Sequence, residues 1–204
     1  MKSSFLDELE KEVATTEAAT SAELVLVLTR RAERYPEVPW KAGALLAGAT
    51  FLLIVLLPID FSLYWMILDV ALAFGLGYLT GRASDPCRRL LTSQRRRRGA
   101  VLARAHQTFS ERGVSLTRER TGVLWFYAAM EREAVLLWDV GIERCIPYSH
   151  LGLAAKELER ALRSGDMRAG FRQGFEILRP LLSQHLPPAP DNPNEIPNRP
   201  VVLP

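Results

Sequence analysis

The sequence predicts an α/β domain that is interrupted by a pair of membrane-spanning helices. Two observations lead to this fold class. The first is an apolar block from residue 40 to residue 79, broken once at residues 58–61. The second is the presence, on both sides of this block, of short runs rich in Val and Leu that are typical of buried strands, set between segments with helical spacing. The expected order is helix–strand, membrane hairpin, helix–strand–strand–helix–helix.

The apolar block contains two segments, 40–57 and 61–79, of the length that crosses a bilayer, which is roughly 20 mostly apolar residues. Each contains one charge: Lys41 lies at the end of the first segment and Asp69 lies inside the second. The break between them is too short to cross a membrane again. We therefore expect a helical hairpin over residues 40–80, and a buried hairpin in a soluble protein is the alternative.

Basic residues flank this hairpin on both sides, whereas its turn contains none. By the positive-inside rule, both termini are then cytoplasmic and the turn touches the far side of the membrane. This pattern predicts a two-pass protein of the cell inner membrane whose basic flanks also meet anionic lipids. The flanking residues are Arg30, Arg31, Arg34 and Lys41 before the hairpin and Arg82, Arg88, Arg89 and Arg95–Arg98 after it.

Length, charge, cysteine spacing and missing motifs limit the kinds of function that the sequence supports. Outside the hairpin, the 204 residues leave enough chain for one domain with a core, and the formal net charge is only +3. The cysteines, Cys87 and Cys145, have no metal or redox spacing, which suits a reducing compartment. The charged N-terminus is not a cleavable signal peptide. No GxSxG, Walker, CxxC or HExxH pattern is present, so nucleophilic and nucleotide chemistry have no motif.

The first soluble part is predicted over residues 1–35. Phe5, Leu9 and Val13 form the apolar stripe of a helix that ends near Thr20, and residues 22–29 form a short buried strand. This strand needs a partner in the second soluble part, because a lone strand is not stable. Two prolines in the stretch that follows are expected to prevent helix formation before Trp40.

The second soluble part is predicted over residues 85–186. It begins with one long helix from Asp85 to about residue 112, followed by a hairpin of strands at 122–129 and 134–139. Two helices complete it, the first starting at Ser149 and the second capped by Asp166. Residues 187–204 are rich in Pro and Asn, so we expect an extended and mobile tail.

The sequence of residues 120–147 resembles the central hairpin of the TPM domain family. The residues that match its two strands are Thr121, Gly122, Val123 and Leu124, then Arg132, Val135, Asp139, Gly141 and Ile142. Residues 21–25 are similar to the first strand of that family, and Gly165, Gly170 and Gly174 fit its helix pair. The ending at 191–198 resembles a bacterial membrane subgroup in which two transmembrane segments interrupt the domain.

The resemblance implies a small three-layer α/β/α sandwich split by the membrane hairpin. It also implies three activities found among members: acid phosphatase activity, divalent-metal binding, or service as an accessory protein of a membrane complex. Metal-binding members have acidic residues at strand ends, and here only Asp139 and Glu143 lie in such a stretch, while the loop after the first strand has no aspartate cluster. Asp139 and Glu143 are the candidate metal ligands. The alternative for Asp139 is an exposed turn carboxylate that caps backbone amides before Gly141.

Asp69 is a second candidate, because carboxylates inside a membrane are costly and commonly functional. It is expected to form a hydrogen bond with Thr50 or with a helix of a partner, and a protonated or locally paired structural residue is the alternative. The arginines at 95–98 point around a whole helix, which favours lipid contact over nucleic-acid binding. Gly75, Gly77 and Gly81 indicate close packing of membrane helices rather than a dinucleotide loop.

These observations favour a non-catalytic accessory or interaction module that binds a membrane-protein partner, with no nucleic acid. The alternative is a metal-assisted phosphatase with Asp139 as a ligand, and a third hypothesis is a channel or transporter subunit built through Asp69. The sequence leaves open whether the protein is an enzyme, and it does not identify the partner, the substrate or the oligomeric state.

Overall fold

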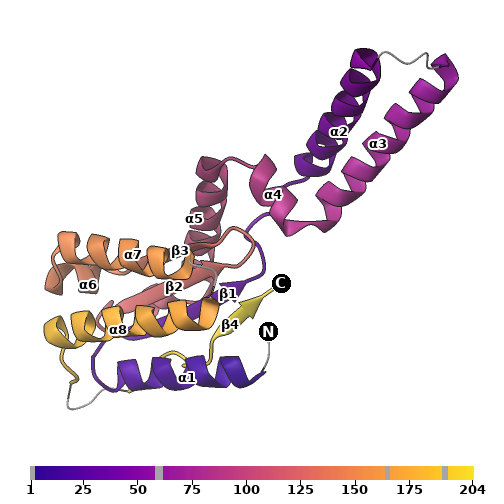
Figure 1. The fold of residues 1–204 in the computed structure, drawn as a ribbon. Coiled ribbons are helices and arrows are strands. Elements are labelled where there is room, and N and C mark those ends of the chain that lie inside the picture. Colours follow the sequence, from indigo (N-terminus) through magenta and orange to yellow (C-terminus); the bar gives the residue numbers. More distant parts are fainter. Residues whose placement is uncertain (1–2, 58–61, 164–165, 190–192) are drawn as a thin grey trace. The chain divides into compact units, whose positions relative to one another are not determined.

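The computed structural model describes residues 3–57, 62–163, 166–189 and 193–204. It shows a mixed α/β protein with two compact units, one formed by residues 1–32 and 98–204 and the other by residues 33–97. Figure 1 shows the elements of both units. The predicted turn at 58–61 and the helix boundary at 164–165 lie outside the described residues.

The first unit is built on a four-stranded mixed sheet with the order β3-β2-β1-β4. Its strands are β1 (Glu23–Thr29), β2 (Gly122–Ala128), β3 (Glu133–Trp138) and β4 (Val201–Leu203). β1 is parallel to both of its neighbours, β2 and β4, and β2 and β3 form an antiparallel hairpin. The predicted hairpin is thus confirmed, and so is the expectation that the strand before the apolar block pairs with the second soluble part.

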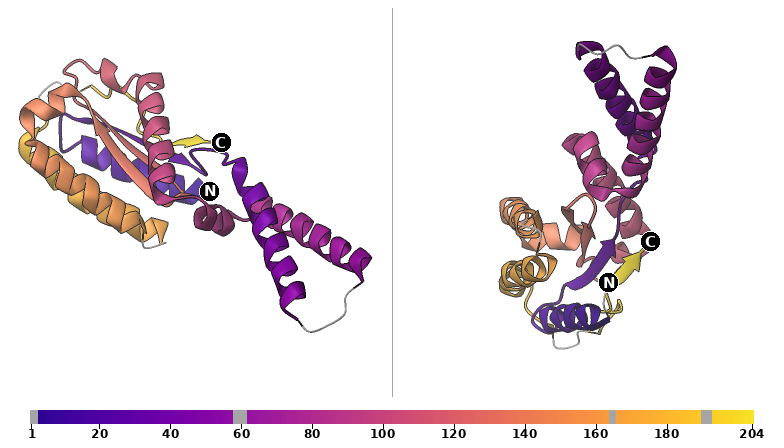
Figure 2. Two further views of the ribbon diagram at one scale, coloured as in Figure 1. Left: turned by 90° about the horizontal axis from the view of Figure 1, so that it is seen from above. Right: turned by 45° about the vertical axis from the view of Figure 1, so that its right-hand side comes forward.

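One face of the sheet is covered by three helices, α1 (Ser3–Glu17), α7 (Tyr148–Arg163) and α8 (Met167–His185). Figures 1 and 2 show these helices on one side of the strands. Alternate residues of β1 and β2, including Leu26 and Trp125, point into this core. The predicted inner faces are confirmed, since Phe5, Leu9 and Val13 of α1 and Phe171, Phe175, Leu178 and Leu182 of α8 are all buried.

The opposite face of the sheet packs against α5 (Gln94–Glu111). The remaining alternate residues of the strands, such as Val27 and Phe126, form a second core with Val101 and Ala105 of that helix. Ile196 and Val201 from the C-terminal segment complete it. Helices therefore lie on both faces of the sheet, and this explains why β1 and β2 are buried along their whole lengths and read as continuous apolar runs.

The second unit contains the two long apolar helices, α2 (Glu37–Leu56) and α3 (Leu63–Ala83), followed by α4 (Asp85–Leu91). α2 begins at Glu37, before the predicted start at Trp40. Pro36 is its N-cap residue and Pro39 lies in its first turn, where proline is tolerated because those N–H groups have no intrahelical acceptor. The expectation that both prolines prevent helix formation was wrong.

The prediction of a single long helix from Asp85 to about residue 112 was also wrong. The chain forms α4 and α5 with a break at Thr92, whose backbone is extended at φ −115° and ψ 128°. The Ser93 hydroxyl accepts the Arg96 N–H at 3.4 Å, and the Arg97 guanidinium donates to the carbonyls of Arg89 and Thr92. Side chains that bond nearby backbone groups in this way compete with helical hydrogen bonds.

Three smaller differences concern the ends of elements. α1 ends at Glu17, three residues before the predicted end, and a short helix α6 (Val140–Cys145) follows β3 where none was expected. The tail predicted to be mobile ends in β4, which pairs with β1. A three-residue strand has too little pattern to be found in sequence, and it forms here because β1 offers an edge for it.

Candidate functional site

The two apolar helices are the most distinctive feature of the second unit. α2 and α3 are long and apolar enough to cross a membrane by length and composition, with mean hydropathies of 1.7 and 1.5. Only 22% of the apolar window of α2 and 6% of that of α3 are buried. Most of their apolar side chains therefore lie on an outer surface rather than in a core.

Small residues bring α2 and α3 together along one seam. A Cβ atom on Gly77 would lie 2.5 Å from the Ala42 carbonyl oxygen, and one on Gly81 would lie 2.9 Å from the Pro39 Cα. A Cβ atom on Gly75 would meet nothing within 4 Å. The predicted close packing is confirmed for Gly77 and Gly81 and does not extend to Gly75.

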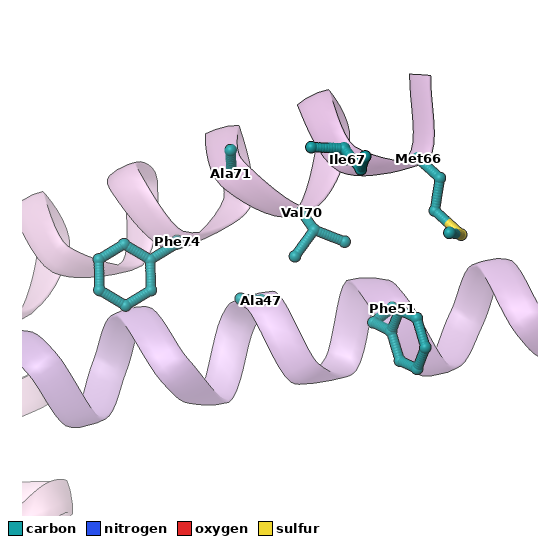
Figure 3. A pocket seen from close by; sticks show the side chains of 7 residues that line it. All are labelled: Ala47, Phe51, Met66, Ile67, Val70, Ala71 and Phe74. Carbon is teal, nitrogen blue, oxygen red and sulfur yellow. The ribbon is translucent and has the colours of Figure 1, made fainter. Parts of the chain in front are cut away.

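The same two helices line an open apolar cavity of about 440 Å³. Figure 3 shows that Phe51 of α2 and Met66, Val70 and Phe74 of α3 surround it. At the other end of the seam, the Trp40 ring packs 5.2 Å from the Tyr78 ring, centroid to centroid, in a T-shaped contact. The hairpin thus has one tightly packed portion and one portion with space between its helices.

Asp69 lies on α3 and is half-buried. It makes no hydrogen bond or ion pair with any residue in the described parts of the chain, and the expected bond to Thr50 is absent. Asp69 is also not among the residues that line the apolar cavity. Its carboxyl group therefore has no bonding partner among the described residues.

Several of the predicted lipid-contacting arginines are used within the protein. Arg88 pairs with Asp85 at 2.6 Å, and Arg96 pairs with Glu33 and Glu37 at 3.3 and 2.9 Å. Arg98 belongs to the first unit and pairs with Glu159 at 3.2 Å. Arg82, Arg89 and Arg95 form no ion pair with a described residue, and the prediction of lipid contact stays a prediction.

Asp139 lies where β3 ends and α6 begins. Its carboxylate receives two hydrogen bonds from the Arg120 guanidinium, at 2.5 and 2.9 Å, and one from the Val140 N–H at 2.8 Å. Arg120 has a left-handed backbone (φ 60°), and its carbonyl accepts the Gly141 N–H at 2.9 Å. The arrangement ties the loop before β2 to the start of α6. Asp139 caps a backbone amide as the alternative expected, but it is buried rather than exposed and its bond to Arg120 was not expected.

Glu143 is exposed, and its carboxylate accepts a hydrogen bond from the Trp138 indole N–H at 3.0 Å. Asp139 and Glu143 therefore each have protein donors. Within the described ranges, no group of three or more His, Cys, Asp or Glu residues is placed to hold a metal ion. The proposal of a divalent metal on Asp139 and Glu143 stays a prediction, and the geometry assigns Asp139 a structural bond to Arg120.

The ion pair between Arg120 and Asp139 predicts that the free energy of unfolding depends on pH. The hydrogen bonds from Arg120 hold the pKa of Asp139 below its usual value, because they stabilise the ionised carboxylate. A lowered pKa gives stability that is present above the unfolded pKa, near 4, and is lost as the pH falls through the folded pKa. We expect Asp139→Asn to lower the free energy of unfolding by about 2 kcal/mol at pH 7, and the difference from the wild type to shrink below pH 4.

Chemical denaturation at pH 7 and at pH 3 measures this difference. Glu143→Gln is the control, because Glu143 is exposed and we expect a change within about 0.5 kcal/mol. A loss in Asp139→Asn that is equal at both pH values would contradict the role assigned to the ion pair.

A second acidic group was missed by sequence analysis. Glu17 at the end of α1 and Glu23 at the start of β1 are buried, with 7% and 4% of their surfaces exposed. They line a cavity of about 200 Å³ together with Asn194 and Asn198 from the C-terminal segment. Glu23 could have indicated this group in the sequence. A carboxyl group at the start of an otherwise apolar, buried strand is unfavourable unless it is hydrogen-bonded or protonated.

The structure also brings two of the three histidines together. His150 of α7 and His185 of α8 lie with ring centroids 5.9 Å apart, although they are far apart in sequence. Cys87 and Cys145 are both free, and Cys145 is exposed. The histidine pair has no third ligand among the described residues.

The fold and these sites define a mixed α/β domain joined to two apolar helices of membrane-spanning length. No family model and no curated protein matches the chain. Among solved structures, it is similar to the NMR structure of the BA42 protein from the psychrophilic bacterium Bizionia argentinensis, with a TM-score of 0.61 and 15% identity. The match covers 99% of this chain and 94% of that one. At this identity the likeness concerns the fold alone.

Proposed function

We propose that this chain is a two-pass inner-membrane protein whose α/β domain is a non-catalytic accessory or interaction module for a membrane complex. The observation that carries the proposal is the exposed apolar surface of α2 and α3. An exposed apolar surface of this extent is unfavourable in water and favourable in lipid. The large exposed side chains include Leu45, Phe51, Leu52, Leu53, Val55 and Leu56 on α2 and Leu63, Ile67, Leu68, Leu72, Leu76 and Leu79 on α3.

A membrane-protein partner is supported by Asp69. A carboxyl group in a lipid-facing helix is costly unless it bonds to another polar group. Because Asp69 has no such bond to a described residue, a polar side chain on a helix of another membrane protein would lower that cost. The proposal therefore places the main contact with the partner inside the membrane.

The finer fold assignment is part of this proposal. We infer a TPM-like three-layer sandwich with both termini in the cytoplasm and the hairpin inserted between the two parts of the domain. Packing of helices on both faces of the sheet supports the layered architecture. The basic residues on both flanks of the hairpin, including Arg82, Arg89 and Arg95, support the orientation.

The phosphatase alternative has less support from the geometry. Its proposed ligand, Asp139, receives two hydrogen bonds from Arg120. A metal ion at this carboxylate would have to displace a charged donor that already neutralises it. A nucleic-acid role is disfavoured for a similar reason, since Arg96, Arg97 and Arg98 are bonded within the protein.

Cysteine labelling in intact cells tests the topology. A chain with Cys87→Ser and Asp60→Cys contains one thiol in the predicted turn and keeps the native, exposed Cys145 in the α/β domain. We expect a membrane-impermeant maleimide to label position 60 in intact cells and Cys145 only after the membrane is permeabilised. Labelling of Cys145 from outside, or recovery of the chain in the soluble fraction, would refute the proposal.

Purification in mild detergent tests the partner. We expect a membrane protein to co-purify in stoichiometric amount with the wild type and to be lost in Asp69→Leu, because leucine cannot form the proposed hydrogen bond. Leu68→Ala is the control, since it changes an exposed apolar neighbour on the same helix and should retain the partner. A wild-type protein that purifies alone, and that hydrolyses a phosphomonoester with a divalent metal, would favour the enzyme alternative.

A further inference from the structure

The C-terminal segment, residues 193–204, is held on the α/β domain by a small number of bonds. The Ile196 N–H donates to the Glu23 carboxylate at 3.3 Å, and the Arg118 N–H donates to the Glu195 carboxylate at 2.9 Å. At the end of the segment, the Thr29 hydroxyl donates to the Pro204 carbonyl at 3.3 Å. Figure 2 shows this segment, in yellow, ending beside β1.

The segment occupies the edge of the sheet next to β1. Three residues of β4 pair with three of β1, in the register Val27 with Val201 through Thr29 with Leu203. Because β4 is the outermost strand, its departure would uncover the hydrogen-bonding groups of β1. A three-residue strand contributes few hydrogen bonds, so the docking of the segment also depends on the contacts upstream of it.

Those upstream contacts lie over the two buried acids. Glu17 and Glu23 share the cavity that Asn194 and Asn198 of the segment help to enclose. Within the described parts of the chain, neither acid forms an ion pair with a basic side chain. An ionised carboxylate that loses contact with water without such a partner is unfavourable. Docking of the segment is therefore coupled to the charge of these two groups.

We propose that residues 193–204 form a strap whose docking on β1 is strengthened by protonation of Glu17 and Glu23 and weakened by their ionisation. The strap would change between a closed form that covers the edge of β1 and an open form that exposes it. This inference concerns the α/β domain alone and does not depend on the proposed membrane function.

The electrostatics of the site support this coupling near neutral pH. Burial raises the pKa of Glu17 to about 7, and the neighbouring charge of Glu23 adds to the effect. Burial also raises the pKa of Glu23, and Glu195 on the strap contributes in the same direction. Hydrogen bonds to the carboxylates oppose these shifts: those to Glu17 come from the Leu24 N–H and the Asn198 side chain, and those to Glu23 come from the Ile196 and Glu195 N–H groups. Burial is the larger cause for both acids, so the pKa of each is raised.

The raised pKa values of Glu17 and Glu23 favour the closed form at low pH. A group whose pKa is higher in the closed form stabilises that form below the pKa of the open form, near 4.5 for an exposed Glu, and the stabilisation is lost as the pH rises through about 7. The charged group that acts on the pair from the strap is Glu195, whose carboxylate accepts the Arg118 N–H. The strap is therefore expected to loosen as the pH rises from about 5 to about 8.

Hydrogen–deuterium exchange of the full-length protein in detergent tests the proposal. The readout is the protection factor of the C-terminal peptide, which compares its exchange with that of an unstructured peptide at the same pH. We expect protection to fall between pH 5 and pH 8 by at most about tenfold per pH unit for each titrating carboxyl. Peptides from β2 serve as the internal reference and should keep their protection.

Replacement of the acids identifies the groups that titrate. Glu17→Gln with Glu23→Gln mimics the protonated pair, so its strap should stay protected at pH 8 and show no pH dependence. Glu10→Gln on the same helix is the matched control and should behave as the wild type. If the double variant also loses protection in β2, each single variant is measured instead, and each should show a smaller pH dependence. A strap with constant protection in the wild type, or with an unchanged decline in these variants, would overturn the proposal.

Discussion

Trp125→Ala is expected to lower the free energy of unfolding of the α/β domain by about 3–5 kcal/mol. Trp125 is fully buried in β2, and its ring lies 4.9 Å from that of Phe171 and 5.2 Å from that of Phe175, both on α8. Truncation removes these contacts and leaves a cavity between the sheet and α8. The surrounding side chains are closely packed, so they relax only partly into this cavity. The variant should therefore unfold at much lower denaturant concentration.

A second tryptophan provides the matched control. Trp138 lies at the end of the edge strand β3, is only partly buried, and packs 6.0 Å from the exposed Tyr148. We expect Trp138→Ala to cost about 1 kcal/mol, because little buried apolar surface is lost. Urea unfolding in mild detergent, followed by circular dichroism, measures both. Equal losses in the two variants would contradict the assignment of Trp125 to the centre of the core.

Gly122→Ala should cost about 3 kcal/mol, at the upper end of the range for overpacking. A Cβ atom at this position would lie 2.0 Å from the Val114 carbonyl oxygen and 2.8 Å from a methyl carbon of the same residue. Val114 is itself fully buried, and the Gly122 carbonyl accepts the Asp139 N–H at 2.9 Å. Gly122 cannot move away without disturbing its pairing with β1, and Val114 is held in the second core.

Gly152→Ala is the counterpart in the same domain. A Cβ atom at this position of α7 would meet nothing within 4 Å. Since alanine favours a helix over glycine by about 0.5–1 kcal/mol, this variant should be slightly more stable than the wild type. The same unfolding experiment measures the change in the free energy of unfolding for Gly122→Ala and for Gly152→Ala. A loss of stability in Gly152→Ala would contradict the open space found around that glycine.

Local pattern was enough to predict most elements of this protein. The positions of the apolar helices, the β2–β3 hairpin and the inner face of α8 were all read from the spacing of apolar residues. Asp166 was correctly expected to cap α8, since its carboxylate accepts the Ala169 N–H at 3.1 Å. These features depend on neighbours within about one turn or one strand, so the sequence contains the necessary information.

The errors occurred where a local rule competed with a specific contact. The break at Thr92 depends on the Arg97 guanidinium, which bonds two carbonyls of the preceding turn. β4 depends on the open edge of β1, which lies more than 170 residues away in sequence (residue 201 pairs with residue 27). The candidate site was affected in the same way, because Asp139 was chosen for its place after a strand and not for Arg120.

The sequence by itself determined the two apolar helices, the order of β1, β2, β3, α7 and α8, and the need for the two parts of the domain to meet. It did so because burial of apolar side chains imposes a period of 2 or 3.6 residues on each element. Only the tertiary structure decided which polar groups meet: Arg120 with Asp139, His150 with His185, and Glu17 with Glu23 beneath the C-terminal segment. Polar contacts have no sequence period, since each is set by the approach of two segments that are distant in the chain.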